Sequence, residues 1–316
     1  MNQQTDSTAD NNTDKKATRK VSVAVIGAGT AGQNAFRQAR KLKDDVLIIN
    51  DGSWATTCIA VGCMPSKLLI AAADRAHDTN HSGEFGIHAT AQIDGKQVME
   101  RVRAERNHFA SYVQKQVESW PDETKIAGRA YINKQGLIEV NDELIEADKI
   151  IVATGSKPFI PDNWADKLGK TLLTSDTVFE LTDLPKSLAV IGAGAIGLEL
   201  AQAFTRLGVE VTLFNRDKRV AGLKDEDISN KAIDCLSREL TMHLGSKIND
   251  VGQQAADNEG PAAFINYEDS AGEARQWQGE YVLVATGRRN NIAALGVENV
   301  GVELDDKNRP KQLDKK

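Results

Sequence analysis

The sequence predicts an α/β protein with two units built on parallel sheets, each carrying small antiparallel additions. Two observations support this fold class. An apolar run, a glycine-rich turn, a helical stretch and a second apolar run follow one another at residues 21–49, and the same order returns at residues 188–214. Each copy is later completed by an apolar run that closes on Ala-Thr-Gly. A strand–helix–strand order implies a parallel sheet with a right-handed crossover.

The elements of the first copy follow from local patterns. Residues 1–20 are polar and are expected to form a disordered tail. Strands are expected at 21–26 and 46–49, with a helix at 30–43 between them. Apolar spacing then predicts two helices and a patch of short strands, at 66–78, 98–120 and 126–145.

The second copy repeats the pattern after a proline-flanked connection at 159–182. Its elements are expected at 188–191 (strand), 195–207 (helix), 209–214 (strand), 228–240 (helix) and 250–281 (an antiparallel patch). Cys235 falls in the last of these helices and is interpreted as a buried apolar residue.

Composition narrows the class of protein further. The chain has 316 residues, of which 41% are hydrophobic and 27% charged, which is typical of a globular protein of about two domains. Its net charge of −6 argues against nucleic acid as a partner. Three cysteines are too few for a disulfide-stapled secreted scaffold. No apolar run approaches the ~18 residues of a membrane span and no signal peptide is evident, so we expect a cytoplasmic protein.

The two copies match position by position. Gly27, Gly29 and Gly32 return 165 residues later, and so does Asn50; the second members are Gly192, Gly194, Gly197 and Asn215. An internal duplication explains this spacing better than chance.

Each glycine triplet follows a strand and opens a helix, which is the context of a Rossmann-like dinucleotide site. The first glycine permits the tight turn, the second lets the backbone approach a pyrophosphate, and the third lets helix and strand pack closely. The phosphate then lies at the positive end of the helix. A purely structural glycine turn would have to occur twice.

The residue after the second strand of such a unit contacts the ribose. In the first unit this is Asn50, a neutral hydrogen-bonding residue, and Asp51 substitutes if the register moves by one. In the second unit Asn215 is followed by Arg216. A neutral residue beside an arginine favours NADP over NAD, although both stay open.

Two cysteines, Cys58 and Cys63, are separated by four residues and stand before an expected helix start at Pro65-Ser66. The helix dipole and Lys67 in the first turn favour a reactive thiolate. The spacing also permits a small disulfide ring. A zinc site would need two further ligands that do not cluster here, so no metal is expected. Two inert buried cysteines are the remaining alternative.

The run from Thr57 to Lys67, placed between two fingerprints, resembles the redox-active segment of the class I pyridine nucleotide–disulfide oxidoreductases. It is most similar to the dihydrolipoamide dehydrogenase-like branch, which includes glutathione and mercuric reductases. The order of motifs from Val21 to Pro310 is also that of the family. The resemblance implies an enzyme that passes electrons between NAD(P)H, FAD and a Cys58–Cys63 disulfide, and on to a disulfide or dithiol substrate.

The resemblance also implies residue roles at the flavin. The first fingerprint would bind FAD, and Cys63 would lie against the flavin as the charge-transfer thiolate. Cys58 would exchange with the substrate disulfide. Lys67 would approach the flavin and pair with Glu199. The remaining cofactor contacts implied are Ala130 beside the adenine, Thr154, Gly155, Gly287 and Arg288.

The family pattern gives the expected domains: 21–155 plus 283–316 for FAD and 156–282 for NAD(P). It also gives a homodimer for a full-length relative. Length alone would fit a low-molecular-weight thioredoxin reductase, but those carry Cys-x-x-Cys in the NAD(P) domain. The soluble transhydrogenase branch lacks the cysteine pair.

The sequence departs from the family after Pro310, where relatives continue into a flavin-binding strand and a dimerisation domain with a catalytic His–Glu pair. This chain stops at Lys316. The alternative hypothesis is therefore a truncated, catalytically incomplete dinucleotide-binding fragment. Ala55-Thr56-Thr57 stands where Gly-Gly-Thr is usual, which separates the chain from typical lipoamide enzymes.

Overall fold

The computed structural model describes residues 18–254 and 262–312, and these form two packed units. The first unit comprises Met1–Gly52, Pro121–Thr154 and Ile292–Lys316. The second comprises Ser53–Trp120 and Gly155–Asn291. The expected tail lies outside the described residues as far as position 17.

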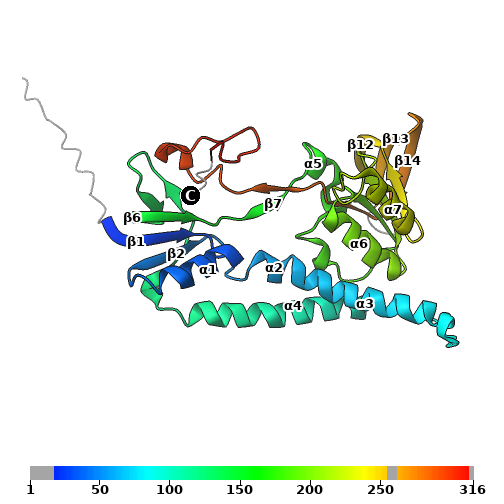
Figure 1. Ribbon diagram of the computed structural model, residues 1–316, viewed down its shortest axis with the longest axis horizontal. Coiled ribbons are helices and arrows are strands. Elements are labelled where there is room, and N and C mark those ends of the chain that lie inside the picture. Colours follow the sequence, from blue (N-terminus) through cyan, green and yellow to red (C-terminus); the bar gives the residue numbers. More distant parts are fainter. Residues whose placement is uncertain (1–17, 255–261, 313–316) are drawn as a thin grey trace, which may run out of the picture. The chain divides into compact units, whose positions relative to one another are not determined.

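The first unit is built on a six-stranded sheet with the order β3-β2-β1-β6-β5-β4 (Figure 1). Strands β1, β2, β3 and β6 run parallel, and β4 and β5 add an antiparallel edge. Its elements are β1 (Thr18–Ile26), α1 (Thr30–Ala39), β2 (Val46–Asn50), η2 (Asp122–Thr124), β3 (Lys125–Ala127), β4 (Tyr131–Ile132), β5 (Ile138–Val140), β6 (Glu143–Val152) and η5 (Val297–Val300).

Strand β1 begins at Thr18, three residues earlier than its apolar pattern predicts. The polar residues Thr18, Arg19 and Lys20 pair with Leu144–Glu146 of β6. Lys20 also forms an ion pair with Glu146 at 3.0 Å. Backbone pairing with a longer neighbouring strand, rather than side-chain burial, therefore extends β1 into the segment expected to be disordered.

The second unit contains a five-stranded sheet with the order β11-β10-β9-β15-β8, a three-stranded sheet β12-β13-β14 and the ribbon β16-β7. Its helices are α2 (Thr57–Ala60), α3 (Cys63–His81), η1 (Ser82–Phe85), α4 (Gly95–Glu118), α5 (Trp164–Leu168), η3 (Gly169–Thr171), η4 (Val178–Glu180), α6 (Ala195–Arg206) and α7 (Glu226–Leu236). Its strands are β7 (Ser156–Pro158), β8 (Leu172–Thr174), β9 (Ser187–Ile191), β10 (Glu210–Asn215), β11 (Thr241–Leu244), β12 (Lys247–Gln254), β13 (Ala262–Glu268), β14 (Ala274–Gly279), β15 (Tyr281–Val284) and β16 (Arg288–Asn290).

The central strand β9 separates two cores of the second unit. Leu188 and Val190 belong to the core that also holds residues of α3, α4 and α6. Ala189 and Ile191 belong to the core shared with the three-stranded sheet. Alternate side chains of a strand point to opposite faces, so one buried strand supports a helical layer and a β-layer.

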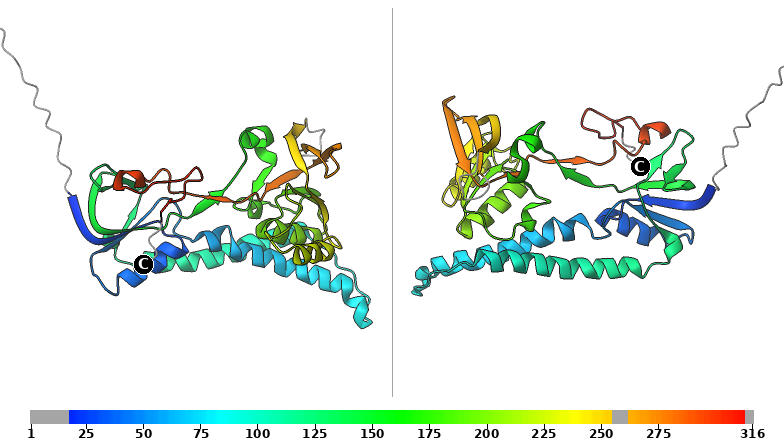
Figure 2. Two further views of the ribbon diagram at one scale, coloured as in Figure 1. Left: turned by 45° about the horizontal axis from the view of Figure 1, so that its top comes forward. Right: turned by 180° about the vertical axis from the view of Figure 1, so that it is seen from behind.

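Helices α3 and α4 lie side by side in the second unit (Figures 1 and 2). Both are longer than the sequence predicts, because α3 continues to His81 and α4 begins at Gly95. The Asp94 side chain caps α4 by accepting a hydrogen bond from Gln97 N at 3.0 Å. A cap of this kind extends a helix beyond its apolar stripe.

One described helical segment, Thr57–Phe85, is long and apolar enough to cross a membrane by length and composition, with a mean hydropathy of 1.3. The stretch includes polar positions, which is why a search for unbroken apolar runs misses it. Core helices pass the same test, but these are mostly buried, whereas 22% of the tested stretch is buried here.

The mixed architecture of parallel and antiparallel sheets confirms the predicted fold class. The expected helix at 228–240 is α7, which ends at Leu236. Cys235 is exposed on it, so the interpretation of a buried cysteine is wrong. Its position on α7 faces away from the core that takes Ala232, Ile233 and Leu236.

Candidate functional site

Both glycine-rich turns place their first glycine in a backbone conformation that side chains rarely adopt. Gly27 has φ +101° and Gly192 has φ +110°. A Cβ at Gly27 would lie 2.4 Å from Ala153 O, and one at Gly192 would lie 2.6 Å from Ala285 O. Each turn therefore packs directly on the Ala-Thr-Gly segment of its own unit.

The second and third glycines of each triplet differ in the space around them: the third is tightly packed and the second is open. A Cβ at Gly32 or Gly197 would come within 1.9 Å of a carbonyl oxygen in its own turn, so the helix could not pack there. A Cβ at Gly29 or Gly194 would meet nothing within 4 Å. Open space at the N-cap of α1 and α6 fits the approach of a pyrophosphate to the backbone.

The two asparagines that end β2 and β10 hold the glycine turns. Asn50 Oδ1 accepts a hydrogen bond from Ala28 N at 2.9 Å, and Asn215 Oδ1 accepts one from Ala193 N at 3.2 Å. Asn215 Nδ2 donates to Asp217 O and Arg219 O, and Asn50 Nδ2 donates to Gly52 O. Both asparagine amides are thus used within the protein.

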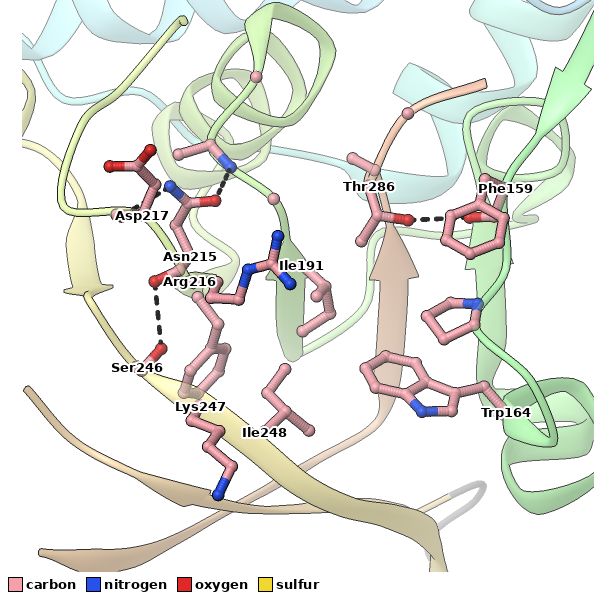
Figure 3. A pocket seen from close by; sticks show the side chains of 17 residues that line it. Phe159, Trp164, Ile191, Asn215, Arg216, Asp217, Ser246, Lys247, Ile248 and Thr286 are labelled. Atoms are coloured by element: carbon pink, nitrogen blue, oxygen red, sulfur yellow. Dashed lines mark hydrogen bonds between the residues drawn. The ribbon is translucent and has the colours of Figure 1, made fainter. Parts of the chain in front are cut away.

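A cavity of about 760 Å³ lies in the second unit beside the Gly192–Gly194 turn (Figure 3). It brings together Asn215 and Arg216, the fingerprint and the second Ala-Thr-Gly segment. It is lined by Phe159, Pro161, Trp164, Ile191, Gly192, Ala193, Gly194, Phe214, Asn215, Arg216, Asp217, Ser246, Lys247, Ile248, Ala285, Thr286 and Gly287. Its size, its apolar walls and its few polar groups suit a nucleotide.

Two cations line this cavity. Arg216 is exposed at the end of β10, and Lys247 begins β12 and lies 3.6 Å from Glu268. The nearest acid on the wall, Asp217, is bound by Arg219 at 3.2 Å, and this hydrogen bond lowers the pKa of Asp217. With Lys247 paired to Glu268 and Asp217 paired to Arg219, Arg216 supplies the net positive charge of the cavity wall. Sequence reasoning missed Lys247, because only the fold holds the residue before it, Ser246, at the end of β10, where Ser246 N donates to Asn215 O at 3.1 Å.

The second Ala-Thr-Gly segment and the arginine that follows it have different partners. Thr286 Oγ1 donates to Phe159 O at 2.9 Å, and Gly287 O accepts from Phe159 N, so this segment shapes the cavity. Arg288 forms an ion pair with Asp176 at 2.7 Å and donates to both Ser156 and Ser175. It does not line the cavity. The structure therefore shows Arg288 tying β16 to β7 and to the turn after β8.

In the first unit, the remaining predicted contacts lie at the strand ends. Ala153 N donates to Ile26 O at 2.8 Å, which sets Thr154 and Gly155 directly after β6. Gly128 N donates to Asn50 O at 2.9 Å, so the segment leading to the buried Ala130 lies beside the end of β2. Asp51 is exposed beside it.

The cysteine pair lies where α2 meets α3. Cys58 lies in α2, a single turn that the sequence did not reveal, and Cys63 is the first residue of α3. Gly62 joins the helices, and a Cβ there would lie 3.0 Å from Thr57 O. A hydrogen bond with the Cys63 side chain, followed by burial, raises the pKa of Cys58. The two thiols are therefore neighbours, with Cys63 exposed and Cys58 partly covered.

One turn further along α3, Lys67 Nζ forms an ion pair with Glu199 Oε1 at 3.1 Å. Glu199 lies on α6, directly after the second fingerprint. Positions four apart on a helix share a face, so Cys63 and Lys67 are neighbours on α3. The Cys63 thiol is therefore followed on α3 by the Lys67 ammonium group, which is paired with the Glu199 carboxylate of α6.

Among residues 18–254 and 262–312, no group of three or more His, Cys, Asp and Glu side chains could hold a metal ion. His77 and His81 stack on each other along α3 with ring centroids 4.0 Å apart. His77 lies 3.9 Å from Glu239.

Comparisons with known proteins give relatives along most of this chain. A mercuric reductase from Streptomyces lividans is 35% identical over 304 residues, which are 90% of this chain and 60% of the relative. A dihydrolipoyl dehydrogenase from Bacillus subtilis is 29% identical over 297 residues, 92% of this chain and 63% of the relative. The chain thus spans 60–63% of the length of these relatives.

A solved structure shares the fold. The HOCl-induced flavoprotein disulfide reductase RclA from Escherichia coli is similar with a TM-score of 0.75 at 22% identity. The similarity covers 92% of this chain and 61% of that one.

The family profile described as pyridine nucleotide-disulphide oxidoreductase matches residues 21–316. The matched range contains both glycine triplets, the cysteine pair and both Ala-Thr-Gly segments. The resemblance inferred from the motif order is confirmed: the chain belongs to the pyridine nucleotide-disulphide oxidoreductase family.

Proposed function

We propose that the chain is a flavin-dependent NAD(P)H:disulfide oxidoreductase of the dihydrolipoyl dehydrogenase type. The observation that carries the proposal is the Cys58–Cys63 pair at the start of α3, with the Lys67–Glu199 ion pair one turn away. The two fingerprints with open backbone at Gly29 and Gly194 support two dinucleotide cofactors.

Residues of the first unit would hold FAD. The open N-terminus of α1 would take the pyrophosphate. Because Asn50 is used to brace the turn, Asp51 is the better candidate for the ribose. When bound, FAD supplies a two-electron relay between NAD(P)H and the cysteine pair. The proposed domains are 21–155 plus 283–316 for FAD and 156–282 for NAD(P).

The cysteine chemistry is dithiol–disulfide exchange. Two electrons and two protons convert the Cys58–Cys63 disulfide into two thiols. The Cys58 thiolate attacks a substrate disulfide, forms a mixed disulfide and releases one substrate thiol. Cys63 then attacks Cys58, which re-forms the protein disulfide and releases the second thiol. The sum is NAD(P)H, a proton and one disulfide giving NAD(P)⁺ and two thiols.

The raised pKa of Cys58 bears on how this thiol is activated. Cys58 keeps its proton more strongly than an ordinary cysteine, because its hydrogen bond with Cys63 and its burial favour the neutral form. It therefore needs a base before it attacks. Small-molecule or protein-bound disulfides are the proposed substrates.

We propose NADP rather than NAD as the pyridine nucleotide. Arg216 and Lys247 supply positive charge on the cavity wall, and the acid beside them, Asp217, is bound by Arg219. A 2′-phosphate gains charge-assisted hydrogen bonds in such surroundings. An NAD site instead carries a carboxylate that binds the ribose and repels the phosphate.

The visible absorption spectrum of the purified chain, before and after anaerobic NADPH, tests the proposed function. The expected result is a flavin band that gives way to a long-wavelength charge-transfer band, which is lost in Cys63→Ser. Flavin bands that NADPH does not change would contradict the proposal.

The second candidate is a dinucleotide-binding fragment without disulfide turnover. The chain spans 60–63% of the length of the relatives it matches, so turnover is to be measured on this chain itself. A colourless protein that binds NADPH would support it, and reduction of lipoamide or glutathione disulfide by this chain would refute it. A homodimer is proposed for a full-length relative.

A further inference from the structure

Helices α3 and α6 are joined by two ion pairs rather than one. The first is Lys67–Glu199 at 3.1 Å. The second is Asp74–Arg206, in which Arg206 Nη1 donates to Asp74 Oδ1 at 2.7 Å. Only the first belongs to the proposed reaction site.

The two pairs have the same spacing on both helices. Lys67 and Asp74 are seven residues apart on α3, and Glu199 and Arg206 are seven residues apart on α6. Seven residues are about two turns, so each helix presents both charges on one face. Since both numbers increase together, α3 and α6 run in the same direction.

The polarity of the second pair is reversed. At the first pair α3 carries the cation, and at the second it carries the anion. A slide of two turns in one direction would set Asp74 against Glu199. A slide in the other direction would set Lys67 against Arg206. Either shift brings like charges together, so the alternation selects one register.

The second pair is the better anchored of the two. Arg206 is 20% exposed, whereas Lys67 is 64% exposed. Arg206 also binds Glu239 with two hydrogen bonds, from Nε at 2.7 Å and from Nη2 at 3.0 Å. Gln202 donates to the same carboxylate at 3.1 Å. These contacts raise the pKa of Arg206 and lower that of Glu239.

The core that α3 and α6 share contains large and small side chains: Leu69, Ala73 and Ala76 on α3, and Leu200, Ala203 and Phe204 on α6. Interdigitated side chains resist sliding, and the two ion pairs add a preference for one register. An exposed lysine–glutamate pair is too weak to hold two helices in place by itself.

We propose that Asp74, Arg206 and Glu239 form a positioning cluster that fixes α3 on α6 and thereby holds Lys67 against Glu199. The inference rests on the proposed function, which assigns Lys67, Glu199 and Cys63 to the reaction. Arg206 acts two turns away from these residues, through the helices that carry them. Its side chain bonds Asp74 and Glu239 and does not line the cavity.

The test is the rate at which the Lys67 amine is acetylated by acetic anhydride, measured by peptide mass spectrometry. Lys224, an exposed lysine outside the cavity, serves as the internal reference. A carboxylate partner slows acetylation because the ion pair shields the nitrogen from the reagent. Glu199→Gln therefore sets the rate of an unpaired Lys67, which we expect to be roughly two- to fivefold faster.

The proposal predicts that Arg206→Gln raises the Lys67 rate to that of Glu199→Gln, although Glu199 is still present. Asp74→Asn is expected to raise it in the same direction, and this half-exposed position provides a second variant should Arg206→Gln fold poorly. Arg238→Gln removes an exposed cation beside Glu239 and should leave the rate unchanged.

A Lys67 rate that stays at the wild-type value in both Arg206→Gln and Asp74→Asn would overturn the proposal, whatever their stability. So would an unchanged rate in Glu199→Gln, because there would be no pair to position. The measurement uses neither flavin nor turnover. A colourless or inactive chain would therefore count against the proposed function. The acetylation rates of Lys67 would still test the positioning cluster.

Discussion

Asn50 accepts a hydrogen bond from the backbone N–H of Ala28 at 2.9 Å, inside the first glycine-rich turn. The same bond recurs 165 residues later between Asn215 and Ala193 at 3.2 Å. In both units the asparagine at the end of the second strand braces the turn that would hold a pyrophosphate. The neighbouring side chains, Asp51 and Arg216, are exposed, and we propose that they recognise the ribose end of each cofactor.

Asn50→Ala should lower the free energy of unfolding by about 1–3 kcal/mol, because the buried Ala28 N–H loses its acceptor. Asn50 is 8% exposed, so water cannot easily replace the bond. Urea unfolding measures the change. Asn249→Ala removes a surface asparagine that donates to Glu268, and it should cost little. Equal losses for the two variants would show that Asn50 does not brace the turn.

The second glycine triplet offers a matched pair of substitutions. Gly197→Ala places a Cβ 1.9 Å from Gly192 O and should prevent α6 from packing, which circular dichroism and thermal unfolding detect. Gly194→Ala meets nothing within 4 Å, so the fold should survive. Its methyl group would instead occupy the space of the pyrophosphate and weaken NADPH binding in a fluorescence titration. Full NADPH affinity in Gly194→Ala would contradict the assigned cradle.

Local patterns were sufficient for the parts of the fold whose physics is local. The glycine triplets, the parallel strands around them and the cysteine pair at the start of α3 could all be predicted, because each depends on a few consecutive residues. The first and last residues of the helices and strands were harder to predict. Thr18 joins β1 through pairing with β6, and Asp94 extends α4 as a cap, and neither effect depends on an apolar pattern.

Residues that meet only in three dimensions were beyond the sequence. Lys247 lines the cavity because the preceding residue, Ser246, is hydrogen-bonded to Asn215 at the end of β10, and Trp164 lines it from α5. Arg288 is expected at a cofactor, and this stays a prediction; what the sequence could not show is its ion pair with Asp176. The position of a residue in a motif does not show which partners compete for its side chain.

Arg216 and Lys247 should determine the choice between the two pyridine nucleotides. Arg216→Gln is expected to weaken NADPH binding roughly tenfold and to leave NADH binding almost unchanged, since only NADPH carries the 2′-phosphate. Lys247→Gln should act in the same direction. Fluorescence titration with both nucleotides measures the ratio. Lys224→Gln, which removes a lysine outside the cavity, is the control.

An equal loss of NADPH and NADH affinity in Arg216→Gln would mean that the arginine supports the cavity in general. Tighter NADH than NADPH binding by the wild-type chain would refute the proposed preference directly. Both results come from binding alone and do not require a complete flavin site.

The reactivity of Cys58 should depend on pH in a direction set by its neighbour. Its pKa lies above the ordinary value of 9.0, first because of the hydrogen bond with the Cys63 side chain and then because of burial. A raised pKa leaves less thiolate at neutral pH, so alkylation of Cys58 by iodoacetamide should be slow at pH 7 and should still rise beyond pH 9. Mass spectrometry of a Cys235→Ser chain, in which the third thiol is absent, measures this profile.

Cys63→Ala in the same background removes the hydrogen bond and should lower the pKa of Cys58. The whole alkylation profile would then move to lower pH, and Cys58 would react faster at pH 7 than it does beside Cys63. Coincident profiles would show that burial alone controls this thiol. A shift in the expected direction would mean that the hydrogen bond with Cys63 keeps Cys58 protonated until a base removes the proton. Cys58 could then attack the substrate disulfide as a thiolate, as the proposed exchange reaction requires.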